Sequence, residues 1–506
     1  MIKSIDNLLN RITMYRLVLY YLIFLLTAAV GLSVLGILKY DVFGLLFSIT
    51  FLIAVCWVVN WIFARTFKVA ANVESVYISA LILALIITPI QSFNDLWFLG
   101  WAAVLAMASK YIIAINRKHI FNPVAFAVAV TYFTLNHSAS WWVGNAPMLP
   151  FVLLGGILVL RKIERSDLVY SFLITSVAIS LMVSIFGGGN PLSALSKIIL
   201  YSPLFFFAFL ILTEPLTTPP TKKLRIFYGL LVGFFFTPQI HFGTFYITPE
   251  VAILLGNIVS YLISPKTRAV LKLKERVKIA PDTYDFVFSN IRHFSFAPGQ
   301  YMEWTLGHTH PDARGNRRYF TLASAPTEKT LRLGVKFYQQ SSSFKKALLN
   351  MNSGDEIVAA QLAGDFILPR DPRQKCVLIA GGVGVTPFRS MIKYLLDTNQ
   401  RRPITLLYAN KCVDDILYKD IFDRAERELG IRTVYTVTDS DRLPAVWKGQ
   451  VGRIDPRMIK SLVPEFRRCI FYVSGPRGMV DSFKESLRLM KIPASQIKTD
   501  FFSGLA

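Results

Sequence analysis

Charged residues are scarce in the first half of this chain. Of 506 residues, 17% are charged and 53% hydrophobic, and residues 1–265 hold only 16 Lys and Arg and 8 Asp and Glu. Disorder requires low hydrophobicity and high charge, so this composition excludes a disordered chain. The mean hydropathy of +0.45 also argues against a purely soluble protein. The net charge of +23 does not indicate nucleic-acid binding, because cytoplasmic membrane loops collect Lys and Arg in the same way.

Cysteine and histidine are scarce too. An iron–sulfur cluster needs thiolates at short spacings, and the four cysteines lack such spacings, which excludes a cluster in this chain. They are Cys56, Cys376, Cys412 and Cys469. Paired membrane haems need four histidines on facing helices. Residues 1–265 hold only His119, His137 and His241, so a haem-bearing membrane domain is excluded and no metal site is predicted.

The first half does contain long apolar runs, and both termini are predicted to be cytoplasmic. Lys and Arg fall almost entirely in one alternate set of loops, which is typical of the cytoplasmic side of a cell (inner) membrane. A straight span needs about 20 residues, and several shorter segments carry a proline near one end, as broken helices at binding sites do. We predict an all-α polytopic membrane domain over residues 1–265. Its ten expected spans are 15–38, 42–64, 75–92, 95–115, 122–136, 147–160, 168–186, 197–213, 225–238 and 249–264.

Two proline pairs recur at one spacing, which indicates an internal repeat. Five spans per copy is an odd number, so the two copies are predicted to be inverted in the membrane; chance placement of proline is the alternative. Lys110, inside the fourth segment, is either a functional intramembrane charge or a lysine that snorkels to the cytoplasmic face. The pairs are 126 residues apart: Thr88-Pro89 with Glu214-Pro215, and Asn122-Pro123 with Thr248-Pro249.

The pattern of a soluble protein begins at about Leu271. Alternating segments at 283–289, 300–306 and 331–338, separated by Gly and Pro, predict a small antiparallel β-barrel over residues 270–372. Residues 373–506 alternate strands with helices, which predicts a doubly wound parallel α/β sheet.

Four motifs follow one another in this half. They are ArgTyrPheThrLeuAlaSer (Arg318 to Ser324), GlnSerSerSerPheLysLysAlaLeu (Gln340 to Leu348), AlaGlyGlyValGlyValThrPro (Ala380 to Pro387) and SerGlyProArgGlyMet (Ser474 to Met479). Together they resemble the ferredoxin–NADP reductase superfamily, whose closing Glu-x-Phe is similar to Asp500 and Phe502 here. The resemblance implies FAD on the barrel, NAD(P)H on the α/β domain and a flavin-dependent NAD(P)H dehydrogenase.

Chemistry supports this assignment for the flavin. An arginine fork pairs with a pyrophosphate, an aromatic ring stacks on the flavin, and a hydroxyl can bind its reactive nitrogen. A serine that caps a short helix turns backbone N–H groups toward the pyrophosphate. An exposed strand arginine and a plain helix cap are the structural alternatives. The predicted cofactor-binding residues are Arg318, Tyr319, Phe320, Thr321, Val335, Lys336, Ser342 and Ser343.

The glycine-rich turn is predicted to hold the coenzyme's pyrophosphate at a helix N-terminus. The expected residues are Gly381, Gly382, Gly384, Val385, Thr386, Pro387, Gly475 and Pro476. Ser474 stands where the superfamily usually has a cysteine near the nicotinamide, and Thr321, Ser474 and Phe502 are the predicted catalytic residues. Lys411 could bind the 2′-phosphate of NADPH. No acidic residue stands at the tip of its strand to bind the ribose 2′-hydroxyl of NADH. The choice between NADH and NADPH stays open.

Two motifs in the first half resemble the membrane flavin subunits of sodium-pumping NADH:quinone reductase and the Rnf complex. They are LysHisIlePheAsnProValAlaPhe (Lys118 to Phe126) and ThrGluProLeuThrThrPro (Thr213 to Pro219). That family attaches FMN to a threonine before the eighth span, but Gly187 to Lys197 contains only Ser193 and Ser196 as hydroxyls. A second flavin, FMN or riboflavin, is therefore expected to be non-covalent, beside Asn122 and Glu214.

Taken together, the two halves predict a single-chain membrane dehydrogenase. Electrons would pass from NAD(P)H through FAD to a membrane flavin or quinone, with the lipid bilayer as the other partner. A redox-driven ion transporter and a membrane-anchored reductase for a separate protein are the alternatives.

Overall fold

The computed structural model describes residues 5, 9, 12–67, 73–115, 118–237, 240–243, 245–264, 268–289, 295–309, 311–312, 315–439, 443–444 and 446–500. The chain divides into two compact units, one running through Ser264 and one beginning at Pro265. Each unit is described by itself below.

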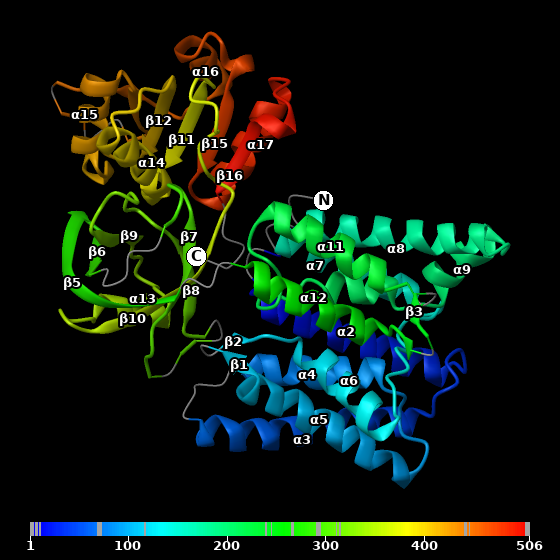
Figure 1. Ribbon diagram of the computed structural model, residues 1–506. Helices are drawn as coiled ribbons and strands as arrows, with labels where there is room; N and C mark the ends of the chain where they lie inside the picture. Colours follow the sequence, from blue (N-terminus) through cyan, green and yellow to red (C-terminus); the bar gives the residue numbers. More distant parts are fainter. Residues whose placement is uncertain are drawn as a thin grey trace. The chain divides into compact units, whose positions relative to one another are not determined.

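The first unit is helical (Figure 1). Each apolar segment of the sequence coincides with a helix, and the eighth coincides with a pair bent by 56°. Three helices, α2, α3 and α8, are long and apolar enough to cross a membrane, and the bent pair is a fourth candidate. The total of ten spans stays a prediction. The helices are α2 (Met14–Val34), α3 (Val42–Thr66), α4 (Val73–Ile86), α5 (Leu96–Ile112), α6 (Pro123–Leu135), α7 (Leu149–Ile163), α8 (Ser166–Phe186), α9 (Pro191–Leu200), α10 (Leu204–Phe206), the π-helix η2 (Phe207–Ile211), α11 (Lys222–Phe235) and α12 (Pro249–Ile263).

The paired prolines occupy matching places in these helices. Pro123 and Pro249 are the first residues of α6 and α12, where a missing N–H costs no helical hydrogen bond. Pro89 and Pro215 each lie a few residues beyond the end of a helix, α4 and η2. These prolines therefore mark where two helices begin and where the chain leaves two others.

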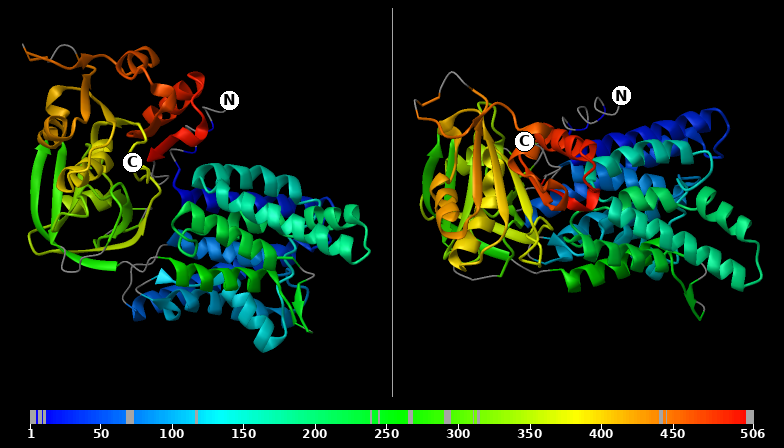
Figure 2. Two further views of the ribbon diagram at one scale, coloured as in Figure 1. Left: turned by 45° about the horizontal axis from the view of Figure 1, so that its top comes forward. Right: turned by 90° about the horizontal axis from the view of Figure 1, so that it is seen from above.

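Helix packing in the second five helices follows that in the first five. Helix α5 packs on α3 and α6, and α11 packs on α8 and α12. Glycines allow the close approach of α11 to α8, which lie side by side in Figures 1 and 2. A Cβ on Gly229 would lie 2.7 Å from the Leu168 carbonyl oxygen, and one on Gly233 would lie 2.8 Å from that of Phe172. Small residues at this spacing are typical of helix pairs in membranes.

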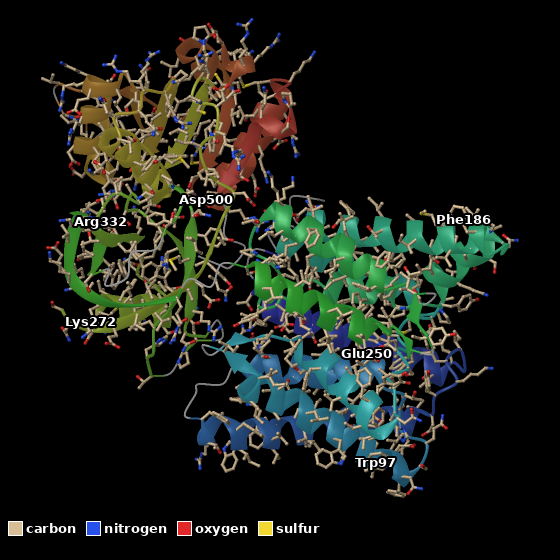
Figure 3. The ribbon with its side chains drawn as sticks, viewed as in Figure 1. Trp97, Phe186, Glu250, Lys272, Arg332 and Asp500 are labelled. Atoms are coloured by element: carbon tan, nitrogen blue, oxygen red, sulfur yellow. The ribbon has the colours of Figure 1, made fainter. Side chains whose placement is uncertain are left out.

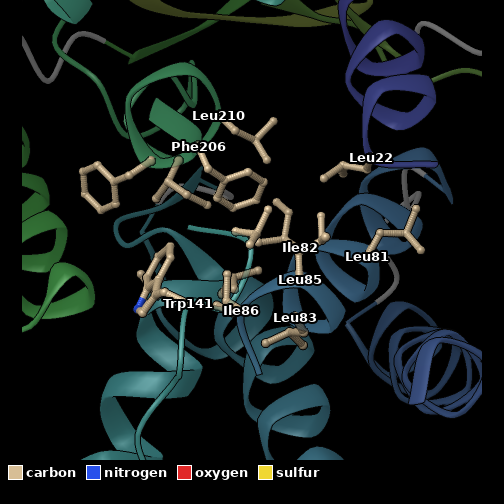
Figure 4. Close-up of a cluster of buried hydrophobic side chains, with 14 of the residues drawn as sticks. Leu22, Leu81, Ile82, Leu83, Leu85, Ile86, Trp141, Phe206 and Leu210 are labelled. Carbon is tan, nitrogen blue, oxygen red and sulfur yellow. The ribbon is translucent and has the colours of Figure 1, made fainter. Parts of the chain in front are cut away.

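The core of this unit joins α2, α4, the bent pair and the loop before α7. Figure 4 shows Leu22, Leu85 and Phe206 packed with Trp141, all of them buried. The end of the Trp141 ring that bears nitrogen points away from these aliphatic side chains.

The second unit begins with a six-stranded antiparallel sheet in the order β8-β7-β10-β5-β6-β9. Alternate residues of β9, Leu331, Leu333 and Val335, point into its core, as the period of a half-buried strand requires. The N–H of Ala323, just after β8, donates to the Arg332 carbonyl in β9 at 3.0 Å. Closure into a barrel stays a prediction. The strands are β5 (Arg268–Ala280), β6 (Thr283–Ser289), β7 (Tyr301–Thr305), β8 (Arg317–Thr321), β9 (Thr330–Lys336) and β10 (Glu356–Ala363), with helix α13 (Ser343–Leu349) before β10.

The predicted parallel sheet follows, in the order β14-β13-β12-β11-β15-β16. Two separate apolar cores flank it, one shared with α14 and α15 and the other with α16 and α17. Helices on both faces make the sheet doubly wound, so its carboxyl edge is where a ligand is expected. The strands are β11 (Cys376–Gly381), β12 (Ile404–Asn410), β13 (Arg432–Val437), β14 (Gln450–Val451), β15 (Ile470–Ser474) and β16 (Ile497–Asp500); the helices are α14 (Thr386–Asp397), α15 (Lys419–Leu429), α16 (Pro456–Leu462) and α17 (Arg477–Leu489).

Candidate flavin and nicotinamide site

The carboxylate of Asp312 is bound both by Arg318 and by the first turn of α13. Arg318 on β8 donates from Nη2 to Oδ1 of Asp312 at 3.0 Å, and the Ser343 N–H donates to Oδ2 of the same residue at 3.2 Å. Ser342 caps the helix by accepting from the Lys345 N–H. A guanidinium and helix N–H groups are the donors that suit a pyrophosphate. These donors fit FAD, because they already bind an anionic group of the chain itself.

Strand alternation separates the other residues predicted to bind the flavin. Phe320 lies on the same side of β8 as Arg318, with its ring 5.9 Å from that of Phe344. Tyr319 points the other way, and its hydroxyl donates to Oε2 of Glu303 at 3.0 Å. In β9, Val335 is 2% exposed and belongs to the core.

Lys336, at the end of β9, contacts the nucleotide sheet. Its Nζ lies 3.3 Å from Oδ1 of Asp415, which follows β12. Of the two β9 residues, Val335 therefore belongs to the core and Lys336 to the contact between the two sheets.

Two of the predicted catalytic residues, Thr321 and Ser474, meet around Asp500. The Thr321 hydroxyl donates to Oδ2 of Asp500 at 3.2 Å. Asp500 ends β16 in register with Ser474 at the end of β15, and Thr321 and Ser474 are both buried. Burial raises the pKa of Asp500 to about 7. Figure 3 labels Asp500. The predicted role of Phe502 falls outside the described residues.

The glycine-rich turn packs directly on the turn after β15. A Cβ on Gly384 would lie 2.5 Å from the Gly475 Cα, and one on Gly475 would lie 3.3 Å from the Gly381 Cα. Gly382 has φ +52°, a conformation that favours glycine. The two turns can therefore meet at the carboxyl edge only because these residues are glycines. The contact between the turns requires glycine whether or not a ligand is bound.

Both turns lead into helices. Thr386 and Pro387 form the first turn of α14, and Val385 before them is buried. Pro476 is the N-cap of α17. Two helix N-termini therefore start at the edge where the coenzyme is expected.

Two acidic residues, Asp415 and Asp439, lie near Lys411 in the fold. Asn410 ends β12 and is 5% exposed, and Asp415 follows in the next turn. Asp439, just beyond β13, donates its N–H to the Lys411 carbonyl at 2.9 Å. The carboxylate at the tip of the neighbouring strand could be found only from the strand order, because 28 residues separate it from Lys411.

A polar network joins the two sheets of this unit. Tyr418 donates to Oδ1 of Asp285 at 2.9 Å, and Arg332 reaches Oδ2 at 3.2 Å. Arg389 on α14 donates from Nη2 to Oε1 of Glu328 at 2.9 Å and is itself 4% exposed. Burial raises the pKa of Asp285, and the Arg389 charge opposes that shift. This network holds α14, and with it the glycine-rich turn, against the antiparallel sheet.

The two residues predicted in the first unit, Asn122 and Glu214, belong to two separate hydrogen-bonded groups. Asn122 caps α6 with its Oδ1, and its N–H donates to Oδ1 of Asn257 at 2.8 Å. Asn257 donates to the Tyr228 hydroxyl at 2.8 Å. Glu214 is bound through Oε1 to Nε2 of His119 at 2.9 Å. The side-chain oxygens of Asn122 and Glu214 therefore already have hydrogen-bond partners within the chain.

Lys110 is bound to the start of α4. Its Nζ donates to the Ser75 carbonyl oxygen at 2.9 Å and to the Ser75 hydroxyl at 3.0 Å. Among the residues with described positions, no group of three or more His, Cys, Asp and Glu could hold a metal ion.

Two family models match the chain. Residues 142–270 match the NQR2, RnfD, RnfE family, and residues 378–485 match the oxidoreductase NAD-binding domain. Both resemblances seen in the sequence are confirmed.

Curated relatives match a little under half of the chain. A flavohemoprotein of Oceanobacillus iheyensis is 25% identical over 250 residues, which is 46% of this chain and 59% of that protein. A glycine betaine monooxygenase reductase subunit of Chromohalobacter salexigens is 26% identical over 222 residues, 42% of this chain and 59% of that protein. The chain thus spans about three fifths of the length of these relatives.

Solved structures match a similar share of the chain. A cytochrome P450 reductase of Amycolatopsis is 23% identical, with a TM-score of 0.42, and covers 47% of this chain and 71% of its own. A ferredoxin NADP⁺ reductase of Neisseria gonorrhoeae, with bound FAD and NADP, is 19% identical, with a TM-score of 0.39, and covers 47% and 99%.

Proposed function

We propose that this chain is a membrane-bound flavin oxidoreductase that takes electrons from NAD(P)H and passes them through FAD to a flavin or quinone of its first unit. The observation that carries the proposal is the meeting of Thr321, Ser474 and Asp500, which come from both sheets of the second unit. FAD, when bound, accepts a hydride and releases electrons singly. Arg318 and Ser343 would hold its pyrophosphate, and Phe320 would lie beside its ring.

The protein's own groups supply orientation and a proton at this site. The Thr321 hydroxyl is held by Asp500, so its oxygen stays in one position beside Ser474. Because burial raises the pKa of Asp500 to about 7, the carboxyl can hold or release a proton near neutral pH. Gly384 and Gly475 keep the two turns close enough for one coenzyme to touch both.

The proposal gives the first unit ten spans in two inverted halves, with both termini cytoplasmic in the inner membrane. The matching packing of α3–α5–α6 and α8–α11–α12 supports the repeat. We place the membrane domain at residues 1–265, the FAD domain at 270–372 and the nucleotide domain at 373–506. A second flavin, non-covalent FMN or riboflavin, would lie near Asn122 and Glu214.

Anaerobic reduction of the purified full-length protein tests the proposal. NADH or NADPH should bleach the bound flavin, and extraction should release FAD, with FMN or riboflavin as a second, non-covalent flavin. Ser474→Ala should slow bleaching while leaving the FAD content unchanged. Folded protein that carries no FAD, or FAD that neither coenzyme reduces, would refute the oxidoreductase.

Redox-driven ion transport is the second candidate, and one observation favours it. Glu250, inside the helical unit, is 1% exposed and has no cationic partner among the described residues. Ionisable residues inside membrane domains are costly and usually serve transport or catalysis. Ion flux into sealed vesicles during NAD(P)H oxidation separates this candidate from a dehydrogenase that moves no ions.

A further inference from the structure

Glu250 is a buried carboxyl group with one oxygen unused. It lies in the first turn of α12, and Figure 3 labels it within the helical unit. Its Oε2 accepts from the Trp141 indole N–H at 2.9 Å. Its Oε1 is buried and has no hydrogen-bond partner among the described residues. The Thr248 hydroxyl lies within reach of the carboxyl but misses hydrogen-bond geometry, and its oxygen too is without a partner.

Irregular backbone surrounds this carboxyl group. Trp141 has φ +50°, which is rare for a bulky residue, and its N–H donates to the Ile86 carbonyl oxygen at the end of α4. Its ring lies 5.9 Å from that of Phe207, the first residue of the π-helix η2. Broken helices and π-turns inside membrane domains are typical of places that bind a substrate or an ion.

The other acidic residues of this unit with described side-chain pairs have cationic or histidine partners. Glu74 pairs with Arg16, Asp167 with Arg225, and Glu214 with His119. The side-chain donors beside Glu250, the Trp141 indole and the Thr248 hydroxyl, are both neutral. An isolated carboxylate in a medium of low dielectric constant is far less stable than the neutral acid.

Among the side chains that the structure describes, no charged group on the packed elements faces Glu250. Helix α6 has no charged residue, and α11 carries Lys222, Lys223 and Arg225 only in its first turn. Helices α11 and α12 are consecutive and are joined by a hairpin of β3 (His241–Phe242) and β4 (Phe245–Tyr246), so their first turns lie at opposite ends. His137, in the loop with Trp141, packs on the Trp97 and Phe98 rings, 5.2 Å away from each.

We propose that Glu250 is a proton-binding site of the membrane unit. The proton lies on Oε1, Trp141 fixes Oε2, and exchange with solvent occurs when the Trp141 turn moves. The bound species is a proton rather than a metal cation. A hard cation takes about six oxygen ligands, whereas the described side chains here offer one free carboxyl oxygen and one hydroxyl, and no group of three or more His, Cys, Asp and Glu lies among the described residues. The site does not depend on flavin chemistry, although it would supply the ion for a redox-driven transporter.

Infrared spectroscopy of the full-length protein in detergent tests this directly. The resting protein should show a carbonyl stretch of a protonated carboxylic acid that shifts in D₂O. Glu250→Gln should remove one component of the band and leave the contribution of other protonated acids such as Asp500, and the matched control Glu74→Gln should leave the band unchanged. Trp141→Phe should move the band, because Oε2 loses its donor. Equal gel-filtration profiles and NAD(P)H–dye reductase rates would show that the variants are folded.

Each other outcome overturns the proposal. A band that is unchanged in Glu250→Gln belongs entirely to other acids such as Asp500, and the absence of a band in the wild type means that Glu250 is ionised. A band that never shifts in D₂O marks a sealed structural acid without exchange. Loss of the band on replacing KCl with NaCl at constant pH would identify an alkali cation as the ligand. None of these readings requires flavin reduction, so the oxidoreductase proposal stands or falls separately.

Discussion

Replacing Asp312 with asparagine should make the protein bind FAD more tightly. The Asp312 carboxylate lies on Arg318 and on the Ser343 N–H, the groups proposed for the pyrophosphate of FAD. Loading the cofactor therefore requires that this carboxylate leave, and its charge then repels the incoming phosphates. The substitution removes the charge at nearly the same side-chain volume and keeps the Asp312 N–H, which donates to the Ser343 hydroxyl at 2.9 Å.

The magnitude follows from the strength of the displaced interaction. Hydrogen bonds to charged groups contribute about 1.5–3 kcal/mol. Both partners here are partly shielded, since the side chains of Arg318 and Asp312 are 12% and 27% exposed. Loss of this competition should lower the dissociation constant of FAD by roughly ten- to hundredfold.

Titration of flavin-stripped protein with FAD, followed by flavin fluorescence, measures the effect. Asp355→Asn is the matched control, because Asp355 lies in an exposed turn where its carboxylate accepts from the Asn352 N–H. An unchanged or weaker affinity in Asp312→Asn would show that the pyrophosphate does not use these donors. Higher salt should reduce the difference in FAD affinity between Asp312→Asn and the wild type, because part of that difference is electrostatic.

Three further predictions concern the second unit. The pKa of Asp500 is about 7 in the folded protein, against an ordinary 3.8. The free energy of unfolding should therefore fall by about 4 kcal/mol in all as pH rises from about 4 to 7. In Asp500→Asn, the free energy of unfolding measured in urea should change less with pH over that range. Gly384→Ala should slow flavin reduction by NAD(P)H roughly tenfold in stopped flow with FAD retained, because the new Cβ would lie 2.5 Å from Gly475; unchanged reduction would contradict the tight contact of the two turns. Glu328→Gln should lower the free energy of unfolding by about 3 kcal/mol in the same urea assay, because the buried Arg389 charge loses its ion-pair partner. A decrease below about 1 kcal/mol would show that solvent compensates for the lost pair.

Much of the local structure could be predicted from the sequence, because the chemistry that decides it is local. Apolar runs locate the helices of the first unit, and Pro123 and Pro249 mark helix starts since proline at the first position costs no hydrogen bond. Alternating polarity locates β6 and β9, and a glycine-rich turn after a hydrophobic strand locates the start of α14. The order of the motifs also indicated the two families that the comparisons confirmed.

Only the tertiary structure decided which of these residues touch. Thr321 and Asp500 are 179 positions apart, and their contact depends on the docking of two sheets rather than on any local pattern. The role of Gly384 changed for the same reason: its missing side chain makes room for Gly475 before it makes room for a ligand. Glu250 follows Pro249 at the start of a helix, and its isolation is visible only in the fold, where packed helices bury it and the described residues provide no cation beside it. Secondary-structure propensity and hydropathy act over a few residues, so the sequence alone determines the helices and strands. Burial and charge pairing depend on which residues surround a side chain after folding, so the fold determines the chemistry of the side chains.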